Sequence, residues 1–409
     1  MLNFARFGGA RPQRPVLFAA PHRVMFFSGA LQTVAAFAWW AWLMLARAGG
    51  WPAPALPWPA SWLHGAFAVY GVLPFFVFGF LMTAMPRWQG LGEIGGRAYL
   101  LTWALLTAGW ALFHAGLLWP ALLAPALWLV VVGWIAGVLV LAEVAFAPGD
   151  DRRHALHAWV ALAAGVPGLA CLIGYTSFGW QFGPRLAEAI GVWACLVSLF
   201  IVVCHRMVPF FSASVIPKYR MVRPYWALAV LLGASIVHLL LQTGELPTWL
   251  WLPDGAMALV ASWLSWRWKL RESFRARLLA MLHLGFLWLP AALWLSAGQS
   301  LALAAGHAVL GLAPLHALSI GFFGSMLVAM VSRVTLGHSG RTLQADAATW
   351  HLFLGLQTVA LLRVGAELSA SVYDVLVAAA AVLWLLIFCL WCVKVIPIYL
   401  RPRADGRPG

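Results

Sequence analysis

Histidine is the residue type in this sequence whose chemistry and placement point most directly to a function. Of the twelve histidines, five lie at or near one set of ends of the apolar segments: His64, His114, His238, His307 and His316. Six lie at or near the other ends: His22, His154, His157, His205, His338 and His351. His283 lies about 9 Å into its segment, six residues at the α-helical rise. Neutral imidazole binds transition metals and haem iron without help from a carboxylate, so these positions favour metal or haem chemistry.

The spacing of the histidines does not by itself define a metal site. No pair has the HxxxH spacing along one helix, so a site must join different helices. For any single histidine, an interfacial or hydrogen-bonded residue is the simpler interpretation. Carboxylates lie near segment ends (Glu143, Glu188) or near loops (Glu93, Glu245, Asp254, Asp374). A proton- or sodium-coupled transporter usually needs a buried carboxylate, and the sequence predicts none in mid-helix.

The elements that position the histidines are membrane helices. The chain has 409 residues, of which 63% are hydrophobic and 9% are charged, whereas soluble domains are about a quarter charged. This composition excludes soluble enzymes and secreted modules. The net charge of +14 does not indicate a nucleic-acid partner, because the basic residues sit in short runs between apolar segments. Twelve segments are long enough to span a bilayer: 22–46, 62–86, 97–118, 121–147, 155–176, 186–209, 224–243, 247–266, 277–297, 312–336, 347–368 and 371–400.

The distribution of Lys and Arg predicts the orientation of these twelve helices. With the N-terminus inside, 23 of the 26 basic residues fall on the inner side, and the outer side keeps Arg47, Arg185 and Arg363. Basic loops favour the cytoplasmic side. The expected fold is therefore an all-α polytopic membrane protein with both termini cytoplasmic, forming a single membrane domain over residues 1–409.

An internal repeat of six helices is one interpretation of two matches at an offset of 180 residues. Arg87-Trp88 recurs as Arg267-Trp268, and the motif at 215–219 recurs at 395–399. A parallel 6+6 repeat would give halves at 1–210 and 221–400. Alternatively, basic and aromatic residues recur at inner interfaces without any repeat.

Two segments have an unusual composition. Residues 64–90 and 316–341 each run from an outer histidine through Gly, Phe and Met to an inner basic turn. Small residues allow a flat ligand or a neighbouring helix to approach closely. Composition alone favours ordinary helix packing.

The same residues resemble the NnrS family of polytopic membrane proteins. The matching motifs are Pro21-His22-Arg23, the segment from Gly79 to Gly90, Arg206-x-x-Pro209-x-Phe211, Leu282-His283-Leu284-Gly285-Phe286, and the segment from His316 through Arg333 to Gly337-His338-Ser339-Gly340-Arg341. The last is long enough to be specific. One departure concerns Ala66 and Phe67, where many members carry a second His and a Glu.

The resemblance implies a multi-pass protein of the bacterial inner membrane that binds haem and copper and acts in the response to nitric oxide and nitrosative stress, as in denitrification. His64 and His316, both near the outer face, are the expected ligands of a haem, taken to be b-type. Arg363, on the outer half of its helix, could pair with an outer propionate or line a polar cavity, or else extend to the interface. Arg333 lies near the inner face, where it could pair with haem propionates, although the excess of basic residues on that side explains it equally well. His22, His283 and His338 are the expected copper ligands, since imidazole suits copper. Nitric oxide is the expected ligand or substrate, and the electron donor is unknown.

Three functions stay open from the sequence. The first is a haem- and copper-binding protein of nitric-oxide defence and, if an enzyme, an oxidoreductase acting on nitric oxide. The second is a twelve-helix secondary transporter of the major-facilitator type. The third is a haem or copper sensor or chaperone without turnover. No acid pair, phosphate loop or nucleophile–base motif is visible, so any chemistry would belong to the cofactor.

Overall fold

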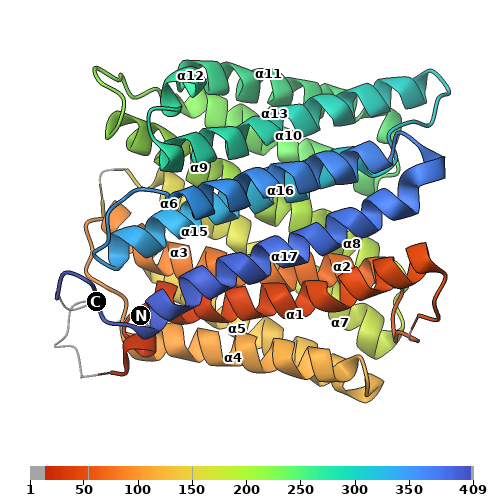
Figure 1. Cartoon of the computed structure of the whole chain (residues 1–409), viewed down its shortest axis with the longest axis horizontal. Coiled ribbons are helices and arrows are strands. Elements are labelled where there is room, and N and C mark those ends of the chain that lie inside the picture. The colour runs from red at the N-terminus through yellow and green to blue at the C-terminus, as the bar shows by residue number, and fades with distance from the viewer. Residues whose placement is uncertain (1–13, 54, 150, 407–409) are drawn as a thin grey trace. The chain divides into compact units, whose positions relative to one another are not determined.

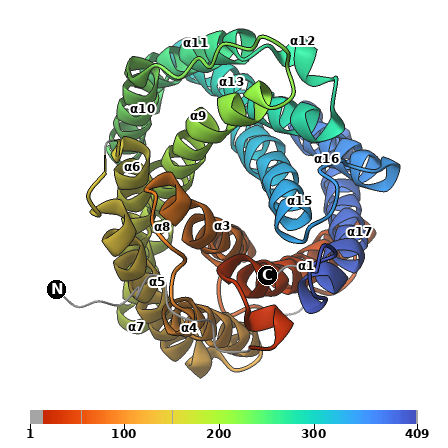
Figure 2. The ribbon, with the colours of Figure 1, turned by 90° about the vertical axis from the view of Figure 1, so that its left-hand side faces the viewer.

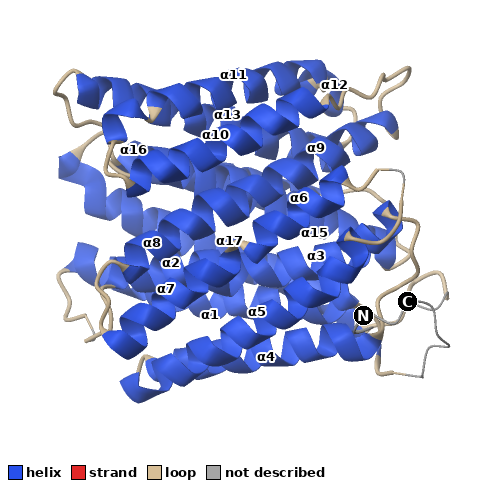
Figure 3. Ribbon diagram, turned by 180° about the vertical axis from the view of Figure 1, so that it is seen from behind, coloured by secondary structure: helices blue, strands red, loops and turns tan. Residues whose placement is uncertain are grey.

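The structure is a computed structural model that describes residues 14–53, 55–149 and 151–406. Within these ranges the regular structure is entirely helical, as Figure 3 shows, which confirms the expected all-α class. Three of the basic residues counted on the inner side, Arg6, Arg11 and Arg407, lie outside the described residues.

The described residues include eleven helices long and apolar enough to cross a membrane. The remaining predicted segment, 247–266, forms a short 3₁₀ turn, η5 (Pro247–Trp249), followed by α11 (Trp251–Arg267). At 17 residues, α11 is at the short end of the range for a spanning helix. The segments predicted from hydropathy are thus all helical in the structure, and the chain is a multi-pass membrane protein.

The helices follow one order of elements three times (Figure 1). The first group is α1 (Pro21–Gly49), α2 (Ala60–Ala66), η2 (Phe67–Val72), α3 (Leu73–Trp88), α4 (Gly96–Gly116), η3 (Pro120–Leu122) and α5 (Leu123–Ala145). The second is α6 (Arg153–Ala163), α7 (Gly165–Phe178), α8 (Gly183–Ala189), η4 (Ile190–Val197), α9 (Ser198–Ala213), α10 (Tyr225–Thr243), η5 and α11. The third is α13 (Arg277–Ala304), α14 (Ala313–His316), η6 (Ala317–Gly324), α15 (Ser325–His338), α16 (Ala347–Ala366), η7 (Ala370–Val372) and α17 (Tyr373–Leu400). The short helices η1 (Val16–Phe18) and α12 (Leu270–Ser273) lie outside this order.

In each group the second span contains a π-helical segment, namely η2, η4 or η6, and the last span begins with a 3₁₀ turn. The π segments begin at Phe67, Ile190 and Ala317, so the period is about 125 residues. The expected 6+6 repeat is not confirmed. Its second motif forms a turn at 215–219 but part of α17 at 395–399, so equal residues there have different structures.

The described residues divide into two compact units. The first comprises those of Met1–Ala36, Pro54–Leu199 and Ile396–Gly409, and the second those of Phe37–Ala53 and Phe200–Val395. Both units are therefore built from segments that are distant in the sequence.

Small residues set the helix contacts of the first unit. Figures 1 and 2 show α4 beside α5, where a Cβ on Gly109 would lie 2.6 Å from a Val130 methyl group. A Cβ on Gly168 would lie 1.9 Å from the Tyr70 hydroxyl, which donates a hydrogen bond to the Ala187 carbonyl at 2.6 Å. Close approach through glycine is typical of helix packing in lipid, where dispersion replaces the hydrophobic drive.

In the second unit, α13 packs against α11, which forms a hairpin with α10. It also packs against η6 and α15, the π-containing span of its own group. In η6, Gly321 faces the Trp288 ring of α13, and a Cβ added to Gly321 would lie 2.4 Å from Cδ2 of that ring. The Trp288 indole donates to Gln357 Oε1 at 2.7 Å, and Gln357 in turn donates to Ser325 Oγ at 2.9 Å. This chain of contacts ties α13, α16 and the start of α15 together.

Candidate functional site

His64 and His316 each lie just before a π-helical segment. His64 is in α2, three residues before η2, and His316 is the last residue of α14, directly before η6. Both side chains are half-buried. A π segment inserts an extra residue into an α-helix, and such insertions are frequent at functional sites. The two predicted haem ligands therefore occupy similar local positions, one in each unit.

The ring orientation of His316 is set by its own helix. Its Nδ1 lies 3.0 Å from the Leu312 carbonyl oxygen, which can only accept a hydrogen bond. In a neutral imidazole, Nδ1 therefore carries the proton and Nε2 carries the lone pair. Metal-binding histidines commonly donate their second ring nitrogen in this way.

His283 has the same kind of support from a neighbouring helix. It is buried in α13, and its Nε2 lies 2.9 Å from Ser212 Oγ of α9. The Ser212 hydroxyl donates its proton to the Val208 carbonyl at 2.9 Å, so it accepts from His283. This arrangement places the lone pair of His283 on Nδ1.

His22, in the first turn of α1, has a weaker version of the same arrangement. Thr83 Oγ1 donates to the Gly79 carbonyl at 2.7 Å and lies 3.4 Å from His22 Nδ1. His22 is buried, whereas His338, the last residue of α15, is half-buried. His22 belongs to the first unit, and His283 and His338 belong to the second.

No group of three or more His, Cys, Asp or Glu side chains within the described ranges is arranged to hold a metal ion. The copper set of His22, His283 and His338 therefore stays a prediction. The same holds for the pairing of His64 with His316 on one haem, because these two residues belong to different units. The hydrogen bonds define which ring nitrogen carries the lone pair in neutral His316 and His283.

The two predicted haem-binding arginines have different surroundings. Arg333 is 9% exposed in α15, and its guanidinium carbon lies 3.9 Å from the centre of the Phe211 ring. No hydrogen bond or ion pair of Arg333 occurs within the part of the chain that the structure describes. A desolvated guanidinium without an anionic partner is costly, so Arg333 is suited to hold an anionic group such as a propionate.

Arg363 already has an anionic partner in the protein. Its Nη1 lies 2.8 Å from Glu367 Oε1, one helical turn further along, and the two side chains are 8% and 11% exposed. Tyr373 accepts a second, longer hydrogen bond at 3.4 Å. The i,i+4 spacing of Arg363 and Glu367 is visible in the sequence, although the sequence analysis predicted a propionate as the partner of Arg363. Glu367 compensates the charge locally.

Arg23, another basic residue near the predicted inner face, binds the end of α17. Its Nη1 donates to the carbonyl oxygens of Tyr399 at 3.1 Å and Arg401 at 2.9 Å. A cation at a helix C-terminus is favourable because the last carbonyls lack partners within the helix. The buried position of Arg23 is thus explained by the fold.

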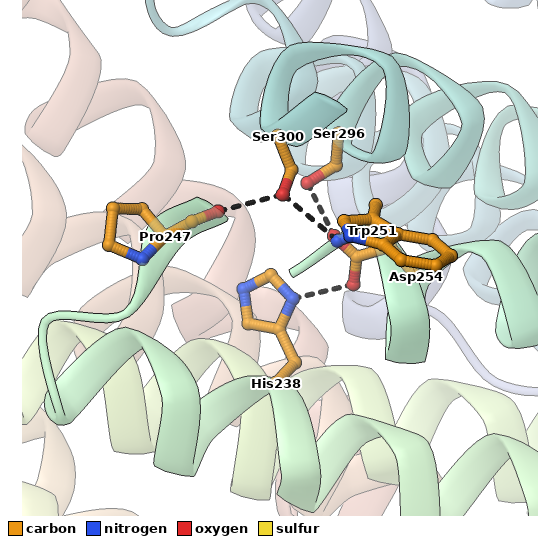
Figure 4. A network of polar contacts seen from close by, with 6 residues as sticks. All are labelled: His238, Pro247, Trp251, Asp254, Ser296 and Ser300. Carbon is orange, nitrogen blue, oxygen red and sulfur yellow. Dashed lines mark hydrogen bonds and ion pairs between the residues drawn. The ribbon is translucent and has the colours of Figure 1, made fainter. Parts of the chain in front are cut away.

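The sequence analysis missed a polar network in the second unit, which Figure 4 shows. Asp254, expected near a loop, lies in the first turn of α11, and its full burial was not predicted. His238 Nδ1 of α10 lies 2.6 Å from Asp254 Oδ1, and Ser296 Oγ of α13 donates to Asp254 Oδ2 at 2.6 Å. The helix begins four residues later than the predicted segment at 247, so hydropathy placed its first turn incorrectly. The sequence signal for this pair is the separation of 16 residues between His238 and Asp254, which brings them together when α10 and α11 form a hairpin.

The comparison with known proteins identifies the family. No match is found among curated proteins. Residues 16–403 match the family described as NnrS protein, which is nearly the whole chain. The motifs around His22, Gly79, His283 and His316 all fall inside this range. The chain therefore belongs to the NnrS family, the family of the nitric-oxide response that its motifs resemble.

Proposed function

We propose that this protein binds haem and copper in the membrane and acts in defence against nitrosative stress. Haem and copper would supply the binding and redox chemistry toward nitric oxide. The observation that carries the proposal is the orientation of the candidate ligands: His316 and His283 each have one ring nitrogen held by a hydrogen bond, which leaves a defined lone pair. Pre-oriented neutral imidazoles are the donors that haem iron and copper require.

The protein residues have separable roles in this proposal. In this proposal His64 and His316 would bind haem. Arg333 lies about 25 Å further along the span that contains His316, at the α-helical rise. It would therefore hold an anionic group, such as a propionate of a second haem, at the inner face. His22, His283 and His338 hold copper, with Ser212 positioning His283. Because Arg363 is paired with Glu367, a propionate there would have to compete with that carboxylate. The proposed location is the bacterial inner membrane, and the apolar helices support a multi-pass membrane protein.

Absorption spectra of the purified protein test the haem assignment. After expression with sufficient haem and copper, we expect a Soret band that shifts on reduction with dithionite. His64→Ala and His316→Ala should each lose or strongly alter this band. His157→Ala is a matched control, because His157 Nδ1 is held by a backbone carbonyl four residues earlier, as in His316, but the side chain is exposed. Absence of a Soret band in the wild type, or its retention in both ligand variants, contradicts the assignment.

Copper analysis tests the second set. His22→Ala, His283→Ala and His338→Ala should each lose bound copper while the Soret band remains. Ser212→Ala removes the hydrogen bond to His283 and should weaken copper binding about 10- to 100-fold, as for other residues that orient a ligand. Ser214→Ala is the control, since Ser214 is exposed and bonds only its own turn. Unchanged copper content in all three histidine variants contradicts the set.

One observation favours the alternative of a secondary transporter. A proton- or sodium-coupled transporter usually needs a buried carboxylate. Asp254 lies in the first turn of α11 rather than in mid-helix, but its side chain is fully buried. A transporter of the major-facilitator type predicts substrate flux in proteoliposomes that persists after metal removal and stops in Asp254→Asn. Haem-dependent nitric-oxide binding without such flux favours the first proposal.

A further inference from the structure

The second unit contains two ion pairs with little exposure to solvent that differ in the chemistry of their cation. Arg363 pairs with Glu367, and His238 pairs with Asp254. A guanidinium does not release its proton in a protein, whereas imidazole exchanges its proton near neutral pH. An arginine would hold a carboxylate permanently, as at position 363. At position 238 the cation is instead an imidazole, the kind of group that can exchange its proton.

The geometry joins three helices through the Asp254 carboxylate. His238 of α10 contacts Oδ1, and Ser296 of α13 donates to Oδ2, both at 2.6 Å (Figure 4). The exposed fractions of the His238 and Asp254 side chains are 5% and 0%. Because the serine bonds the carboxylate and not the imidazole, this is not the order of a serine-hydrolase triad. The serine instead stabilises the charged form of Asp254.

The His238–Asp254 pair is electrically neutral when it holds one proton, and the other ionisable groups of the surrounding helices lie away from it. Besides His238 and Asp254, the ionisable side chains of α10, η5, α11 and α13 are Tyr225 at the start of α10, Arg267 at the far end of α11, and Arg277 and His283 toward the far end of α13. In the adjoining turns, Glu245 and His307 are exposed. Imidazolium with carboxylate is neutral, and loss of the proton leaves one negative charge in an apolar setting, which is unfavourable.

A polar face on α13 leads from the pair toward the surface. Ser300, one turn beyond Ser296, donates to the Pro247 carbonyl at 2.7 Å and accepts from the Trp251 backbone N–H at 3.0 Å. Pro247 is exposed at the turn between α10 and α11. Asp254 lies one helical turn from Trp251. The carboxylate is thus within two turns of an exposed segment.

We propose that His238 and Asp254 form a proton-binding site, in which one proton is shared between imidazole and carboxylate and exchanges with water at the Pro247 turn. Release of the proton leaves neutral imidazole and carboxylate. Because His238 and Ser296 hold Asp254 from two helices, proton release weakens the attachment of the α10–α11 hairpin to α13. The site does not depend on haem or copper, so it is separate from the function proposed above.

Infrared difference spectroscopy on the full-length protein in lipid nanodiscs tests the site. Spectra recorded across a pH titration should contain carboxyl and imidazole bands with a common midpoint. Asp254→Asn should remove both sets, and His238→Gln should shift the midpoint of the remaining carboxyl band. Asp374→Asn is the matched control, an aspartate in the first turn of α17 whose ion pair with Arg47 is exposed, and it should keep both sets.

Each other outcome overturns the proposal. A difference spectrum of Asp254→Asn equal to the wild type shows that the Asp254 carboxylate does not take part in binding the proton. An unchanged midpoint in His238→Gln shows that the proton is not shared. If Asp254→Asn does not fold, Ser296→Ala replaces it, since it keeps both ionisable groups and removes one donor to the carboxylate. Its carboxyl midpoint must then differ from that of the wild type, and an equal midpoint contradicts the proposal.

Discussion

Arg363 illustrates how a single charge is accommodated inside an apolar helix. Its guanidinium and the Glu367 carboxylate lie one turn apart with little exposure to solvent. Removing one partner of a buried pair leaves the other charge uncompensated, which typically costs about 3–5 kcal/mol. We therefore expect Arg363→Gln to lower the free energy of unfolding by an amount of this order, measured by denaturation in micelles.

Two control variants distinguish loss of the Arg363–Glu367 ion pair from a general effect of mutation on stability. The double variant Arg363→Gln/Glu367→Gln should be less damaging than Arg363→Gln, because no lone charge stays buried. Arg47→Gln breaks an exposed pair with Asp374 and should change stability by at most about 1 kcal/mol. Equal effects of Arg363→Gln and Arg47→Gln would contradict the burial argument.

Asp346 combines two roles at the start of α16. Its carboxylate accepts from the Thr349 backbone N–H at 2.9 Å, capping the helix, and pairs with Lys394. Partial burial alone would raise the pKa of Asp346, but the hydrogen bonds from Lys394 and Thr349 outweigh it and lower the pKa to about 2. Because the folded pKa is below the ordinary value, the stabilisation is complete at neutral pH and is lost as the pH falls toward about 2.

Substitutions at Asp346 separate the cap from the ion pair. Asp346→Ala should cost about 1 kcal/mol through loss of the cap. Asp346→Asn should cost less, because Asn caps equally well and the lost ion pair is 60% exposed at Asp346, hence screened. The stability difference between wild type and Asp346→Asn should shrink on acidification. A difference that grows at low pH would contradict the assignment.

At the scale of elements, the α–π–α spans define this fold. Each of the three groups carries one as its second span. In two of these spans a histidine, His64 or His316, lies in the leading helix within three residues of the π segment. Their close packing depends on glycine, as at Gly321 in η6, where a Cβ would meet the Trp288 ring. The ring is itself held by Gln357, so it has little freedom to move away.

Gly321→Ala should therefore lower the free energy of unfolding by about 1–3 kcal/mol, the usual effect of overpacking. Gly298→Ala in α13 is the control, because nothing lies within 4 Å of an added Cβ there. It should raise stability by about 0.5–1 kcal/mol, since Ala favours helix more than Gly. Thermal denaturation of both variants measures the difference, and equal effects would contradict the packing argument.

At the scale of the whole molecule, the orientation rests on the count of basic residues. The expected outer loop after α4 exposes Leu118, and the expected inner loop after α15 exposes Leu343. Leu118→Cys should react with a membrane-impermeant maleimide in intact cells, and Leu343→Cys only after permeabilisation. The native cysteines give a low background, since Cys171, Cys195, Cys204 and Cys392 are buried and Cys389 is half-buried. The reverse labelling pattern would contradict both termini lying inside.

Much of the fold follows from properties of single residues and short segments. Hydropathy over about twenty residues places the spans, because any helix of that length and composition is more stable in lipid than in water. The histidine-rich motifs also lie in continuous segments, which is why the family match and the positions of His64, His283 and His316 were recognisable from the sequence.

Distances between residues far apart in the chain are decided only when the helices pack. The pairing of His238 with Asp254, the Ser212 contact of His283 and the Arg23 contact with the end of α17 all join different helices. None has a local pattern, because the side chains meet through the angles and registers at which the helices cross. The π segments depend on that packing as well, since an inserted residue is tolerated where neighbouring helices hold the widened turn. The amino-acid order thus specified a membrane protein rich in histidine, and tertiary packing decided which of its polar groups are paired, oriented or buried.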